Sequence, residues 1–132
     1  MMSIYSYSAY DNEPLKINPK LVEYYKNECD PYLVNLKREL TRSLVDYKLF
    51  QDLQEINNSY YKIISGLIDN TYTSLTELFN DSKTLTNNTN KFQKSCYGKI
   101  DGDIFDSIYH NCENILITIN KLTQTVKTVN LK

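Results

Sequence analysis

The sequence has few of the residues that form turns. Its 132 residues include three glycines, three prolines and no tryptophan. This scarcity excludes a sandwich or barrel of many short strands, because each connection in such folds needs turn-forming residues. Hydrophobic residues make up 41% of the chain and charged residues 23%, which is enough for one packed core. The composition favours an all-α fold of a few long helices in a single domain.

The sequence also has no surplus of basic charge and no long apolar run. Fifteen Lys and Arg against sixteen Asp and Glu leave a net charge of -1, which argues against nucleic acid as the main partner. No segment approaches the roughly 20 apolar residues that span a bilayer. Residues 1–10 lack the basic and apolar regions of a signal peptide. We therefore predict a cytoplasmic or nuclear protein that is not secreted and has no membrane span.

Few residues could act as nucleophiles or metal ligands. The three cysteines, Cys29, Cys96 and Cys112, have no spacing typical of a metal site and are expected to be reduced, partly buried thiols. His110 is the one histidine. It lies two positions from Cys112, so on a helix the two side chains would point about 200° apart. No Cys–His pair is therefore expected to form.

One acidic cluster could be mistaken for a cation site. Asp101, Asp103 and Asp106 form the densest acidic cluster, and alternating carboxylates occur in calcium-binding loops, but the twelfth position of such a loop is Cys112 here instead of Glu. Carboxylates at the start of a helix stabilise its dipole, so we expect these residues to cap a helix. The glycines are too widely spaced for a phosphate-binding loop. The sequence predicts no catalytic residue, no metal site and no cofactor.

Apolar residues at helical spacing are the strongest positive signal. The clearest stripe occupies the last thirty residues, at steps of three and four: Ile104, Ile108, Cys112, Ile115, Ile119, Leu122, Val126 and Val129. This spacing places side chains on one face of a helix. Further apolar residues beside the stripe widen the face, and a broad face is typical of a bundle core instead of a two-stranded coiled coil.

Helix start and stop signals divide the chain. Asn18-Pro19 and Asp30-Pro31 each place a capping residue before a proline, which the first turn of a helix tolerates. They predict helices over residues 19–29 and 31–68, although the apolar stripe of the second shifts register near residues 44–49.

Two further helices follow. Ser74 and Glu77 form a capping-box pattern that predicts a helix over residues 74–97, ended by Gly98. The last helix is predicted over residues 103–130.

The N-terminal segment shows no helical period. Over residues 1–17, Tyr5, Tyr7 and Tyr10 alternate with small residues, and we expect an extended Tyr-rich arm. Tyrosine is favoured at interfaces because its ring is buried while its hydroxyl finds a partner. Residues 18–132 are then one domain. The prediction is an elongated helical bundle of three long helices and one short N-terminal helix, with coiled-coil-like packing.

Long helices with broad apolar faces favour a function in protein–protein interaction. We expect a non-enzymatic module, either a subunit of a helical multi-protein assembly or an adaptor, that packs against its own copies or against other proteins. The predicted partner-binding residues lie on the arm and on two stripes: Tyr5, Tyr7, Tyr10, Leu49, Leu53, Ile56, Tyr60, Ile63, Ile115, Ile119, Leu122 and Val126.

Two alternatives stay open at this point. One is a viral or microbial helical-bundle effector or inhibitor that binds a host or toxin protein through a groove. The other is a virion or filament subunit with weak nucleic-acid contact through the acid-free, lysine-containing stretch of residues 83–99. An enzyme ranks last, because no acid–base or nucleophile–base pair can be assembled from the sequence.

Overall fold

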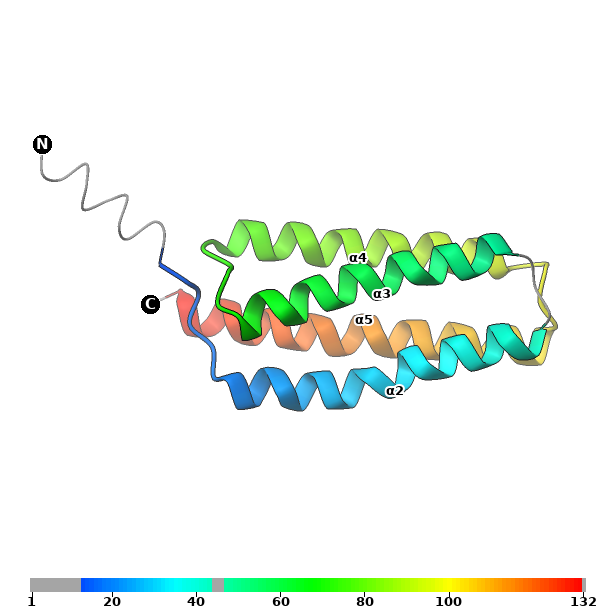
Figure 1. The fold of residues 1–132 in the computed structure, drawn as a ribbon, viewed down its shortest axis with the longest axis horizontal. Coiled ribbons are helices and arrows are strands. Elements are labelled where there is room, and N and C mark those ends of the chain that lie inside the picture. Colours follow the sequence, from blue (N-terminus) through cyan, green and yellow to red (C-terminus); the bar gives the residue numbers. More distant parts are fainter. Residues whose placement is uncertain (1–12, 44–46, 132) are drawn as a thin grey trace, which may run out of the picture.

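A computed structural model describes residues 13–43 and 47–131 of the chain. These residues form four helices: α2 (Pro19–Ser43), α3 (Tyr47–Ile68), α4 (Leu75–Cys96) and α5 (Gly102–Asn130). The helices run alternately up and down in an elongated bundle (Figure 1). The turn between α3 and α4 lies at the same end of the bundle as the start of α2 and the end of α5. The predicted all-α bundle is confirmed. None of the described helices is both long enough and apolar enough to cross a membrane.

The four helices enclose a single core. Each packs against two neighbours, in the order α2, α3, α4, α5 and back to α2, so that α2 lies diagonally across from α4 and α3 from α5. The apolar stripes face inward along most of their length, although Val129 at the end of the α5 stripe is exposed. The largest fully buried side chains come from all four helices. Burial of these stripes is the main force that holds the helices together.

Helix α2 does not stop where the sequence suggested. The expected short helix over residues 19–29 is wrong, because α2 continues without interruption through Pro31. Buried residues recur on both sides of the proline, with Cys29 before it and Leu33 after it. Pro31 itself is exposed, so its ring faces solvent. Core packing on the inner face therefore outweighs the hydrogen bond that a proline removes from a helix.

The expected single helix over residues 31–68 is also wrong. The structure divides this span into the C-terminal part of α2, which ends at Ser43, and α3, which begins at Tyr47. The register shift near residues 44–49 marks this division, because two antiparallel helices need not share one continuous stripe. The bundle consequently has four helices of 22 to 29 residues, instead of three long helices and a short one.

The second half of the chain agrees closely with its prediction. Ser74 is the N-cap of α4 and accepts a hydrogen bond of 3.1 Å from the backbone N–H of Glu77. Helix α4 ends at Cys96, and Gly98 has a φ of 79°, the left-handed conformation expected of a glycine stop. Asp101 is the N-cap of α5, but its side chain makes no capping hydrogen bond.

Residues 13–18, the described part of the N-terminal segment, lie across the end of the bundle that holds the turn between α3 and α4. The backbone N–H of Leu15 donates to the carbonyl of Tyr72 at 2.8 Å. The backbone of Lys16 is paired twice with the Asn130 side chain, at 2.8 Å and 2.7 Å. Leu15 and Ile17 pack against the core. These residues join the turn between α3 and α4 to the end of α5.

Candidate functional site

The predicted partner-binding residues on the helices are part of the chain's own core. These nine side chains are at most 3% exposed: Leu49, Leu53, Ile56, Tyr60, Ile63, Ile115, Ile119, Leu122 and Val126. They pack the four helices of one chain together, and one of them, Leu53, also lines a surface groove. Tyr5, Tyr7 and Tyr10 lie outside the described residues.

The thiols are buried and unpaired with one another. Cys29, Cys96 and Cys112 are free and lie in the core. Burial raises the pKa of the Cys29 and Cys96 thiols to about 12, and that of Cys112 further, because the interior disfavours the thiolate. His110 lies on the surface of α5, where its ring contacts that of Tyr109. In the part of the chain that the structure describes, no three His, Cys, Asp or Glu side chains could hold a metal ion.

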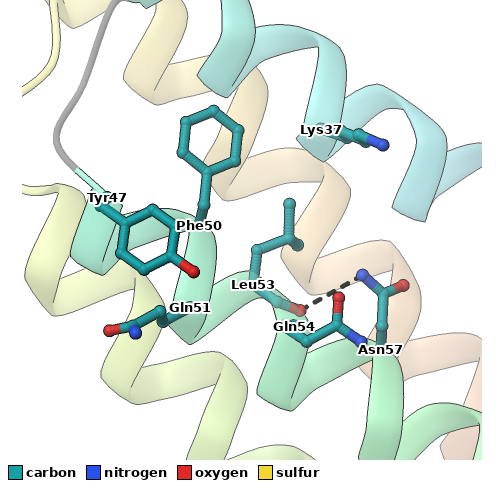
Figure 2. A pocket seen from close by; sticks show the side chains of 7 residues that line it. All are labelled: Lys37, Tyr47, Phe50, Gln51, Leu53, Gln54 and Asn57. Carbon is teal, nitrogen blue, oxygen red and sulfur yellow. Dashed lines mark hydrogen bonds between the residues drawn. The ribbon is translucent and has the colours of Figure 1, made fainter.

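A groove lies on the surface between α2 and α3. Two adjoining cavities of about 320 and 660 Å³ share Lys37 and Asn57 and together form the α2–α3 groove. Its α2 side is lined by Asp30, Leu33, Val34, Lys37, Arg38, Thr41 and Arg42. Its α3 side is lined by Tyr47, Phe50, Gln51, Leu53, Gln54, Asn57 and Tyr61. Figure 2 shows the end of the groove near Tyr47, with the Phe50 and Leu53 side chains directed from α3 toward α2.

The floor of the groove is apolar and open to solvent. Val34 is 58% exposed and Tyr61 is 44% exposed, and they lie on opposite sides of the groove. At the other end, Tyr47 is 75% exposed and Phe50 is half-buried. Single exposed apolar residues are ordinary, but these four gather in one depression. An apolar floor of this kind is typical of a protein-binding surface.

The rim of the groove is basic. Lys37, Arg38 and Arg42 project from one and a half turns of α2. Neither Lys37 nor Arg38 forms an ion pair with any described residue, whereas Arg42 contacts Glu39 at 2.7 Å while its side chain stays 61% exposed. These three cations face solvent beside an apolar floor, where they can attract an anionic partner.

The one acidic residue that lines the groove is already engaged. Lys26 donates to one oxygen of Asp30 and Tyr60 donates to the other, each at 2.7 Å. The hydrogen bond to Asp30 raises the pKa of Lys26. Burial and the same carboxylate raise the pKa of Tyr60. This network links α2 to α3, and Lys26 compensates the negative charge of Asp30, so the groove stays basic.

The sequence patterns do not predict this groove, although two of its features are visible in the sequence. Residues 37–42 hold three basic side chains and one acidic one, an imbalance that the net charge conceals. Val34 and Tyr61 are apolar residues next to the buried stripes, and the stripes alone do not show that a neighbouring helix leaves them uncovered.

The lysines of residues 83–99 lie in and after α4, away from this groove. Lys91 contacts Glu55 at 3.0 Å and Asp52 at 3.8 Å, both on α3. These carboxylates raise the pKa of Lys91, the hydrogen bond to Glu55 first. Lys91 is thus already paired with acids of its own chain.

Comparison of the chain with family models, with curated proteins and with solved structures found no match.

Proposed function

We propose that the protein is a non-enzymatic interaction module whose α2–α3 groove binds a helix of a partner protein. The partner helix carries apolar side chains on one face and carboxylates beside them. It packs into the groove with coiled-coil-like interdigitation of side chains, and the chain acts as an adaptor or as a subunit of a helical assembly.

The dimensions of the groove suit a helix. The α2 side extends from Asp30 to Arg42, which is about 18 Å of helix at 1.5 Å per residue. A partner helix of about three turns would match this length and present anchors at positions i, i+4 and i+7. Apolar anchors would cover Val34 and Tyr61, and neighbouring carboxylates would approach Lys37 and Arg38.

One observation supports the proposal above the others. Exposed apolar side chains and cations without an ion pair among the described residues occupy the same groove. The apolar surface supplies affinity when it is buried, and the cations supply orientation and rapid encounter with an acidic partner. A merely solvated helix face would not gather Val34, Tyr61 and Phe50 in one depression.

The test uses a defined peptide probe. A fluorescent, alanine-based helical peptide of about 15 residues carries Leu at the anchor positions and Glu beside them. A second peptide replaces each Glu by Lys. We expect the acidic peptide to increase its fluorescence anisotropy with the protein, less so at high salt, and the basic peptide to show little binding.

Two groove variants and a matched control make the test specific. Val34→Asp removes apolar surface from the floor, and Lys37→Glu with Arg38→Glu reverses the rim. Each should weaken binding about tenfold or more, since 1.4 kcal/mol is one factor of ten. Lys83→Glu with Lys94→Glu changes the net charge equally on α4, and it should leave binding nearly unchanged. Equal loss in both charge variants, or no binding by the unmodified protein, would contradict the proposal.

A further inference from the structure

Helix α5 carries a surface whose chemistry is the opposite of the groove. Residues 101–117 contain four acidic residues and neither lysine nor arginine. Asp106, Tyr109, Glu113 and Ile117 follow one another at steps of three and four, so they lie on one face of the helix, named here the α5 acidic face. Tyr109 is 44% exposed and Ile117 is 51% exposed. Acidic and apolar side chains alternate along this face.

The α5 acidic face lies on the side of α5 next to α4. Gln93 of α4 donates a hydrogen bond of 3.3 Å to Glu113. Ile117 lines a cavity of about 280 Å³ together with residues of α4, among them Ser82 and Thr86. Because α4 lies diagonally across from α2, the α4–α5 side of the bundle is opposite the α2–α3 groove. The arrangement of the four helices is seen in Figure 1.

The two surfaces also lie at the same height along the bundle. Asn35 of α2 donates a hydrogen bond of 3.2 Å to Asn111 of α5. Residues near 35 on α2 are therefore level with residues near 111 on α5. The basic rim follows Asn35 along α2, and the α5 acidic face includes positions on both sides of Asn111.

We infer that the occupant of the α2–α3 groove is the α5 acidic face of a second copy of this chain, so that copies associate front to back through surfaces on opposite sides of the bundle. The inference rests on the proposed function of the groove and names its partner. Tyr109 and Ile117 of one copy cover Val34 and Tyr61 of the next. Asp106 and Glu113 approach the basic rim.

Association through two different surfaces has a defined consequence. Each copy keeps a free groove at one side and a free acidic face at the other, so the contact repeats and gives an open filament or a closed ring. An interface limited to one groove and one helix face is small, and association through it depends on protein concentration and on salt.

Sedimentation velocity of the full chain at increasing concentration tests this. The unmodified protein should form a series of oligomers that shrinks at high salt. A groove variant, Val34→Glu with Arg38→Glu, and a face variant, Tyr109→Asn with Ile117→Asn, should each stay monomeric. All four substituted positions are on the protein surface, so circular dichroism should confirm folded helices in both variants.

Mixing the two variants provides the decisive comparison. The groove variant retains an intact acidic face and the face variant retains an intact groove, so the mixture should form one-to-one dimers and nothing larger. Monomeric unmodified protein at all concentrations, association of either variant alone, or a mixture that stays monomeric would each overturn the inference. If the acidic peptide still binds the groove in that case, the proposed function stands and only the identity of the partner is wrong.

Discussion

At Gly66, near the end of α3, the backbone lies very close to the ring of Tyr72 in the turn that follows the helix. A Cβ atom added there would lie 2.9 Å from Cδ2 of Tyr72 and closer still to Cε2 of the same ring. Tyr72 cannot easily move away, because its backbone carbonyl accepts from Leu15 and its hydroxyl donates to Asp81 at 2.6 Å. The absence of a side chain at Gly66 is therefore what lets the turn after α3 fold back onto the helix.

Gly66→Ala should destabilise the protein although alanine is the better helix former. Overpacking of a closely packed site costs about 1–3 kcal/mol. Contacts under 3.0 Å favour the upper part of that range, which exceeds the gain in helix propensity of about 1 kcal/mol. Urea denaturation followed by circular dichroism measures the change. Gly102→Ala is the matched control, since an added Cβ there meets nothing within 4 Å and should not lower stability. Equal changes in the free energy of unfolding for both variants would contradict the proposed close packing of Gly66 against Tyr72.

Because of the buried thiols, the free energy of unfolding should change with pH in the alkaline range. A free thiol has a pKa of 9.0, and burial in the folded chain raises the pKa of Cys29 and Cys96 to about 12. Above pH 9 the unfolded chain therefore loses these protons while the folded chain keeps them. The unfolded state binds fewer protons, so the free energy of unfolding falls as pH rises from 9 toward 12.

The expected decrease is at most about 1.4 kcal/mol per pH unit for each such thiol. Burial also raises the pKa of Tyr60 and Tyr72, which adds to the decrease above pH 10. Urea midpoints measured at several pH values should fall through this range. The decrease should be shallower in Cys29→Ala, which lacks one of the groups. A midpoint that stays constant from pH 9 to 11 would show that the thiols ionise freely in the folded protein.

Helix α2 continues through a position at which the local sequence predicts a helix start. Asp30-Pro31 has the form of a helix start, and the sequence accordingly suggested a break there. Yet Cys29, Leu33, Leu36 and Leu40 are buried at helical spacing on both sides of the proline. The long-range period was the better guide, because an exposed proline removes one hydrogen bond while a break would remove a whole buried face.

Pro31→Ala should stabilise the protein. Alanine restores the backbone N–H that proline lacks and relieves its clash with the preceding turn, and interior prolines cost about 3 kcal/mol relative to alanine. Replacing proline also gives the unfolded chain more conformational freedom, so we expect a smaller gain, of about 1–2 kcal/mol, in the free energy of unfolding. Thermal unfolding by calorimetry measures it. Loss of stability would mean that the proline, and not the core, sets the course of α2.

Periodicity predicts the inward faces of these helices well and their outward faces poorly. The stripe in α5 and the caps of α4 were readable because they depend on neighbours within one or two turns. Whether Val34 or Tyr61 is covered depends on which helix lies beside it, and that arrangement is set by tertiary packing. For the same reason the sequence does not show that strongly apolar positions such as Ile56 and Ile119 pack within the chain itself.

In the whole molecule, each long helix has much of its surface facing solvent, and the sides of the bundle differ in charge. The side between α2 and α3 is basic around an apolar floor, whereas the exposed face of α5 is acidic between apolar side chains. The net charge of -1 hides this division. A bundle with such unlike sides is suited to binding in a defined orientation, because wrongly placed faces would bring like charges together.

The most direct test of the central claim is a nuclear magnetic resonance titration of the isotope-labelled full chain with the acidic helical peptide. If the α2–α3 groove is the binding surface, the amide resonances of Val34, Lys37, Arg38 and Tyr61 should shift in proportion to occupancy, and those around Lys83 and Lys94 should stay in place. Shifts centred on α4, or no shifts along the groove at saturating peptide, would contradict the account.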